Sequence, residues 1–92
     1  MAKFLMLGKY SPESIRGASP GRTKEAVRLI EESKGEVDSM FALLGEYDLA
    51  FIAEFPGAAE AMKASLSLSR ETGIAYFTHA ALPVTEFDDW LS

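Results

Sequence analysis

The sequence lacks cysteine altogether. Without thiols the chain can form neither a disulfide framework nor a thiolate metal site, and the absence is typical of a reducing compartment. The N-terminal segment also lacks a long apolar run, because only residues 4–7 are continuously apolar between Lys3 and Lys9. A signal peptide needs about 7–15 apolar residues and a membrane span about 20. We therefore expect neither, and we expect a cytoplasmic protein.

Positive charge is scarce as well. Lys and Arg together number 9 against 14 Asp and Glu, which leaves a formal net charge of −5. Nucleic-acid affinity depends largely on neutralising phosphates, and an anionic membrane surface makes the same demand. We therefore expect no nucleic-acid and no membrane partner, and small molecules or other proteins instead.

The 92 residues, 48% of them hydrophobic, are enough for one globular domain over residues 1–92. Apolar periodicity and turn residues predict four strands and two main helices. A long loop at 11–21 and one final helical turn, capped by Thr85, complete the pattern. The expected strands span 3–10, 36–44, 48–55 and 74–82, and the expected helices span 22–34 and 58–72, with Gly35 and Gly73 as their C-terminal caps.

The order of these elements is βαββαβ, with two halves, 3–44 and 48–82, of similar length and pattern. Right-handed crossovers between the strands then give a four-stranded antiparallel sheet with both helices on one face. The predicted fold class is α+β, of the ferredoxin-like kind.

Both faces of this predicted sheet carry apolar residues. In the third strand Phe51 shares one face with Ala53, while Ile52 lies on the other; strict alternation in the second strand places Val37 with Phe41. Two helices cover only one face, so the other face predicts a protein–protein surface or a ligand site. We expect a homodimer formed through that face. The alternative is that the tail folds back as a lid, with its two aromatic residues over the sheet.

A set of turn and strand residues carries a family resemblance. It consists of Gly45-Glu46-Tyr47-Asp48 before an apolar strand, Glu54-Phe55-Pro56 after it, Arg22, Gly35, Gly73, Thr78 and Ala81. In this order and spacing, over residues 5–87, the chain resembles the GYD-domain family of small bacterial α+β proteins. The resemblance implies a dimeric, ferredoxin-like domain of the dimeric α–β barrel type. It implies no particular reaction, because proteins of similar fold differ in activity.

Three residues are candidates for chemistry. His79, the only histidine, has the titration range for acid–base work and could ligate a haem-like cofactor; a packed interface histidine is the structural alternative. Tyr47 could donate a hydrogen bond to a substrate while Asp48 binds it or takes its proton. Alternatively, Asp48 accepts turn amides and Tyr47 packs at the sheet edge.

Two further residues are candidates for ligand binding. Arg22 stands at an expected helix start and could clamp a carboxylate or phosphate, or it could form an ion pair with Glu25 or Glu46. Tyr10, at the end of the first strand, could add a hydroxyl. We expect no metal site, since the acidic residues of the tail suit a helix N-terminus, and we assign no cofactor.

Two functions therefore remain open. One is a homodimeric small-molecule-binding or regulatory module with a pocket between sheet and helices. The other is a cofactor-free enzyme, monooxygenase-like or isomerase-like, that acts on a small apolar or aromatic substrate through His79 with Tyr47 or Tyr10. No recognisable nucleophile–base spacing occurs in the sequence, which favours the first.

Overall fold

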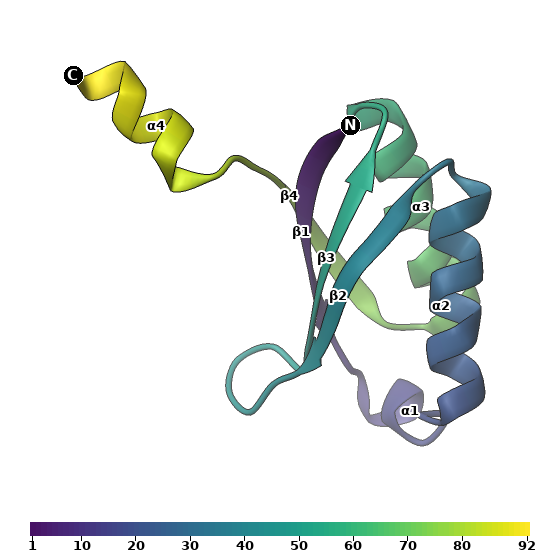
Figure 1. Cartoon of the computed structure of the whole chain (residues 1–92). Coiled ribbons are helices and arrows are strands. Elements are labelled where there is room, and N and C mark those ends of the chain that lie inside the picture. The colour runs from purple at the N-terminus through teal and green to yellow at the C-terminus, as the bar shows by residue number, and fades with distance from the viewer.

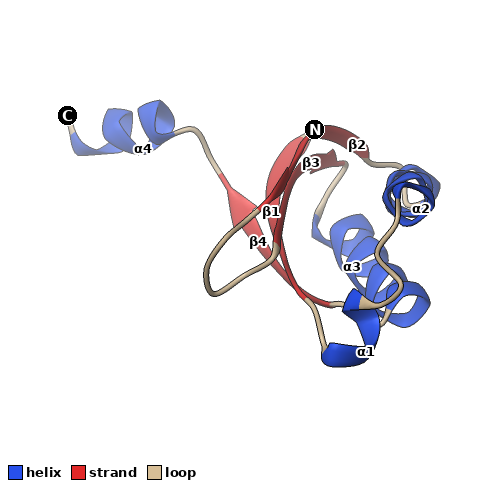
Figure 2. Cartoon of the chain, turned by 90° about the horizontal axis from the view of Figure 1, so that it is seen from below, coloured by secondary structure: helices blue, strands red, loops and turns tan.

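A computed structural model of the chain describes residues 1–92 and shows a sheet with its main helices on one side (Figures 1 and 2). The predicted α+β class and element order are confirmed. Two short helices accompany the main ones, before the first main helix and at the C-terminus. The elements are β1 (Ala2–Lys9), α1 (Pro12–Ile15), α2 (Pro20–Glu32), β2 (Glu36–Ala42), β3 (Leu49–Phe55), α3 (Ala58–Thr72), β4 (Ala75–Ala81) and α4 (Val84–Leu91).

The sheet is antiparallel throughout, with the strand order β2-β3-β1-β4. This order places the two halves' first strands, β1 and β3, side by side in the centre, as the ferredoxin-like fold requires. Helices α2 and α3 both cover the same face, which we call the helix face (Figure 2). The opposite face, called the outer face below, has no helix packed on it.

The core lies between the helix face and the two long helices. Phe55, Met6 and Leu68 are fully buried there, and Phe4 meets Phe55 edge to face at 5.7 Å between ring centroids. Burial alternates along β1 because successive side chains point to opposite faces. Met6 therefore enters the core while its neighbours Leu5 and Leu7 remain half-buried on the outer face.

Strand β2 departs from the predicted alternation. Val37 and Met40 both pack against the core, although they are three residues apart. A β-bulge between Val37 and Ser39 inserts one residue and reverses the parity of the strand after it. The expectation that Val37 shares a face with Phe41 is therefore wrong, and Phe41 lies on the outer face, opposite Ala50.

The predicted loop at 11–21 is more ordered than expected. It contains α1, where Ser11 caps the helix by accepting from the amide of Ser14 at 3.0 Å. Ser19 caps α2 through the amide of Arg22 at 3.1 Å, so this helix begins two residues earlier than predicted. Proline at the first helical position, here Pro20, favours that start.

Gly35 has a different role from the predicted cap. The left-handed residue at the end of α2 is Lys34, with φ 65°. A Cβ on Gly35 would lie 2.7 Å from Cδ1 of Phe55 and 2.9 Å from Cγ2 of Ile30. Glycine is required there by close packing, whereas Gly73 after α3 does take the expected left-handed φ of 74°.

The C-terminal segment also differs from expectation. Helix α4 runs from Val84 to Leu91, without the predicted Thr85 cap, and none of its residues is buried. Figure 1 shows it projecting away from the rest of the chain, on the side of the outer face. It does not lie over its own sheet as a lid.

Candidate functional site

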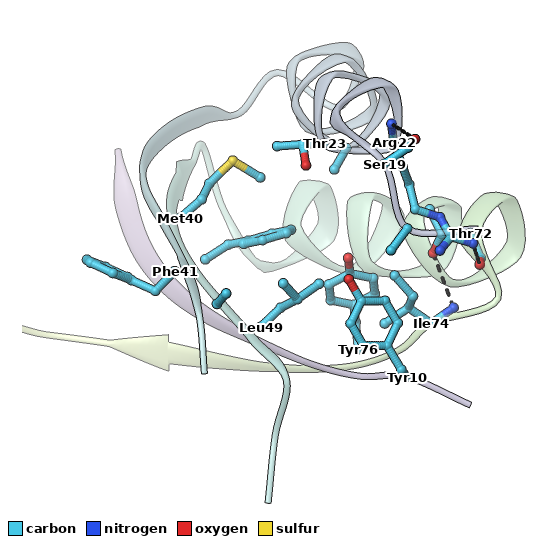
Figure 3. Close-up of a pocket in the computed structure, with 14 residues that line it drawn as sticks. Tyr10, Ser19, Arg22, Thr23, Met40, Phe41, Leu49, Thr72, Ile74 and Tyr76 are labelled. Atoms are coloured by element: carbon cyan, nitrogen blue, oxygen red, sulfur yellow. Dashed lines mark hydrogen bonds between the residues drawn. The ribbon is translucent and has the colours of Figure 1, made fainter. Parts of the chain in front are cut away.

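A cavity of about 490 Å³ lies on the helix face, between the start of α2, the end of β2 and the start of β3 (Figure 3). Ten of its fourteen lining residues are hydrophobic. The lining includes Arg22, Thr23 and Ala26 of α2, Met40 of β2, Leu49 and Phe51 of β3, Tyr76 of β4, and Tyr10 after β1. Cavities of about 300–1,000 Å³ with apolar walls and few polar groups are typical of small-molecule sites.

Arg22 is held at one wall of this cavity by main-chain oxygens. Its guanidinium donates to the carbonyl of Thr72 at 2.6 Å and to the carbonyl of Ser14. These bonds join α1, α2 and the end of α3 at a single side chain. A Cβ on Gly17 would lie 2.9 Å from Nη2 of Arg22, so the chain passes closely over the guanidinium.

The ion pairs considered for Arg22 are not formed. Glu25 pairs instead with Arg28, which also pairs with Glu32 on the exposed side of α2. Arg28 lowers the pKa of the Glu25 carboxyl through a hydrogen bond. Arg22 thus stays with backbone carbonyls, which leave its positive charge uncompensated by any carboxylate beside the cavity.

Tyr10 and Tyr76 line the same cavity, and Figure 3 shows both hydroxyls on the cavity side of their rings. The pKa of Tyr76 is raised to about 12, mainly by burial and in smaller part by nearby Tyr10, against the opposing effect of the positive charge of Arg22. At neutral pH the Tyr76 hydroxyl is therefore protonated and able to donate a hydrogen bond. Gly8 leaves room for this ring, because a Cβ there would lie 3.1 Å from Cε1 of Tyr76.

Sequence reasoning missed Tyr76 as a site residue. The signal was the parity of β4, which puts Tyr76 on the same face as Ile74 and Thr78. That face proves to be the helix face, where Tyr76 packs against Phe51 with ring centroids 5.7 Å apart. Parity groups residues by face but does not say which face is covered.

Asp48 lies in the backbone network that extends the pairing of β1 and β3. Its carboxylate accepts from the amide of Tyr10 at 2.8 Å, and its own amide donates to the carbonyl of Gly8 at 2.9 Å. Tyr47 lies on the outer face and meets Phe77 edge to face, with centroids 5.7 Å apart. These contacts are of the structural kind considered for both residues, and neither side chain lines the cavity.

His79 lies on the outer face, exposed, opposite Leu5 in the β1–β4 register. The sheet therefore separates it from Tyr10 and Arg22 on the helix face. Of the five candidate residues, the structure brings Tyr10 and Arg22 together at one cavity. Their role in binding, and that of His79, Tyr47 and Asp48 in chemistry, stay predictions.

No group of three or more His, Asp or Glu side chains is placed to hold a metal ion. No helix has the length and apolar character that crossing a bilayer requires.

The family model for the GYD domain matches residues 4–91. The chain belongs to the GYD-domain family. The match covers nearly the whole length of the chain, as the turn residues around Tyr47 and the final strand indicated. Neither a curated protein nor a solved structure matches the chain. Membership of the GYD family establishes the kind of domain, and the site has to be interpreted from its own geometry.

Proposed function

We propose that this GYD-domain protein is a homodimeric, cytoplasmic module that binds a small molecule in the cavity of the helix face. The observation that carries the proposal is the position of the Tyr10 and Tyr76 hydroxyls and of Arg22 around one largely apolar cavity. A few convergent polar groups on apolar walls are what orient a ligand in typical binding sites.

The walls also indicate the chemistry of the ligand. Phe51, Met40 and Leu49 offer apolar and aromatic surface. The protonated Tyr76 hydroxyl donates, and the positive charge of Arg22 favours a partial or full negative charge. A molecule with an aromatic or aliphatic body and an oxygen acceptor, such as a carbonyl or carboxylate, fits this combination best.

A thermal-shift series tests binding, with benzoate, phenol, 1,4-naphthoquinone and haem as probes. A probe at about ten times its Kd should stabilise the chain by about 1.4 kcal/mol, which is several degrees in Tm. Tyr76→Phe should weaken that probe by about 0.5–1.5 kcal/mol, because one hydrogen bond is lost. Tyr47→Phe, on the opposite face, is the matched control and should bind as the native chain does. Equal binding by both variants would place the ligand outside the cavity.

The dimeric part of the proposal rests on the outer face. It exposes Phe77 and Phe41 at 45% and 53% of their surface, with no helix to cover them. A second copy offers the same patch, as isologous dimers require. Sedimentation at micromolar concentration tests this, and a chain that sediments as a monomer there contradicts it.

A further inference from the structure

We infer that α4 is an exchanged arm: its apolar side packs on the outer face of a second copy, at the end of the sheet where β2 and β3 are joined. The inference rests on the proposed homodimer and adds to it a defined segment and docking surface. The surface is a set of exposed or half-buried side chains that we call the loop cluster. It consists of Phe41, Leu43, Leu44, Tyr47 and Phe77.

Helix α4 makes no buried contact within its own chain, yet it carries large apolar side chains. Val84, Phe87, Trp90 and Leu91 are each more than half exposed. At about 100° per residue they fall within an arc of roughly 120°, and the acidic residues occupy the remaining side. Phe87 and Trp90 already meet edge to face, with centroids 6.2 Å apart. This is the pattern of a helix that buries one side against a partner.

The outer face is divided along the strands. At the end from which α4 departs it carries Lys3, which is paired with Asp38 at 2.7 Å and Glu54 at 3.4 Å. At the other end it carries the loop cluster, where Leu44 is fully exposed and Tyr47 contacts Phe77. The apolar side of α4 therefore has its matching surface at the far end of the sheet from its own attachment.

Charge separates the two ends of the outer face only weakly, so the apolar surface decides the pairing. Glu86, Asp88 and Asp89 give α4 three negative charges. At the near end of the outer face the only lysine, Lys3, is already paired with two carboxylates, so it is not free for the acidic side of α4. At the loop end, beside Glu46 and Asp48, exposed Lys9 donates to the carbonyl of Glu46 at 2.6 Å and forms no ion pair, so its charge is available to α4. A two-fold axis that sets the strands of the two sheets in opposite directions brings each α4 to its partner's loop end.

The area of the outer face supports an added arm. Four strands about 4.8 Å apart and about seven residues long cover on the order of 450 Å². A stable interface buries about 800 Å² on each partner. An α4 of about 12 Å from each copy adds apolar surface to both sides of such a contact.

The experiment uses Trp90, the only tryptophan, as a reporter in the full chain. A Trp90→Phe chain receives one cysteine at Leu44→Cys, labelled with a nitroxide quencher, and is mixed in excess with the unlabelled native chain. Since the native sequence has no cysteine, labelling is confined to that position. We expect quenching of Trp90 by the label on the other chain. The same label at Lys63→Cys, exposed on α3, is the control and should not quench.

A second measurement gives the contribution of the arm. Phe87→Ser leaves the body of the chain unchanged, because α4 buries nothing there. It should weaken the dimer at least tenfold in sedimentation, from the loss of a buried aromatic side chain. Leu66→Ser, also more than half exposed but on α3, should leave the dimer unchanged.

The outcomes separate the two proposals. If the chain is a dimer, but the Leu44 label does not quench Trp90 and Phe87→Ser does not weaken the dimer, the homodimer proposal stands and the exchanged arm is overturned. A chain that keeps Trp90 and carries the same label at Leu44→Cys tests the lid. Quenching in that chain alone, unchanged on dilution and absent from the mixture of labelled and native chains, shows a lid folded over its own sheet and also overturns the exchanged arm. A monomer at micromolar concentration overturns both.

Discussion

The two faces of the sheet are built from the same four strands but have different surroundings. On the helix face, Phe55, Met6 and Leu68 are fully buried under α2 and α3. On the outer face, Phe77 and Phe41 keep about half of their surface in contact with solvent. An antiparallel sheet with one wet face normally carries polar residues there. The helix face therefore stabilises the single chain, and the outer face is where we propose that a second copy binds.

The largest expected effect is on the free energy of unfolding, when one phenylalanine on each face is replaced by alanine. Phe55→Ala should lower the free energy of unfolding by about 3–5 kcal/mol, because it leaves a cavity in the core. Phe77→Ala should have a much smaller effect on the unfolding of the monomer, since the side chain is 45% exposed. Urea unfolding at submicromolar concentration measures both. Equal losses in the two variants would break the distinction between the faces.

The close packing of the helix layer gives the second test. Gly35→Ala should cost about 1–3 kcal/mol, because its new methyl group overlaps the ring of Phe55. Gly21→Ala is the matched control at the start of α2, where the nearest atom to a new Cβ is Oγ of Ser19 at 3.7 Å. It should be neutral or slightly stabilising. Thermal unfolding of the two variants compares them, and a harmless Gly35→Ala would contradict the packing argument.

A third test concerns the arginine at the cavity wall. Arg22→Gln should cost about 1–3 kcal/mol, because the carbonyls of Ser14 and Thr72 lose charged donors. Arg28→Gln removes a guanidinium from the exposed side of the same helix and should cause no resolvable change. Chemical unfolding in urea measures both. If the two substitutions are equivalent, Arg22 does not join the three helices as described.

The sequence predicted the order of the elements because apolar periodicity and turn residues are local signals. It did not predict the bulge in β2, because inserting a residue after Val37 depends on pairing with β3. It also did not predict the partners of Arg22. Thr72 lies fifty residues away along the chain, so its carbonyl becomes a partner only when α2 and α3 pack together.

The candidate site shows the same limit. Tyr10 and Arg22 could be selected from their positions at the ends of a strand and a helix. Tyr76 could not, because its importance depends on which side of β4 is covered by α3. The parity of the strand left both faces possible. Long-range packing, which the local pattern does not encode, decides that His79 faces outward and Tyr76 inward.

The smallest expected effect is a loss of stability at alkaline pH, which arises from a tyrosine on the helix face. The pKa of Tyr76 is raised from 10.0 to about 12 in the folded chain. Its contribution to stability is therefore complete below pH 10 and is lost as the pH rises towards 12. Across this range the free energy of unfolding of the native chain should fall by on the order of 1–2 kcal/mol more than that of Tyr76→Phe. Tyr47→Phe on the outer face leaves Tyr76 in place and should keep the native decline. Urea unfolding at pH 8, 10 and 11.5 measures the difference, and identical profiles for Tyr76→Phe and the native chain would show that burial does not raise this pKa.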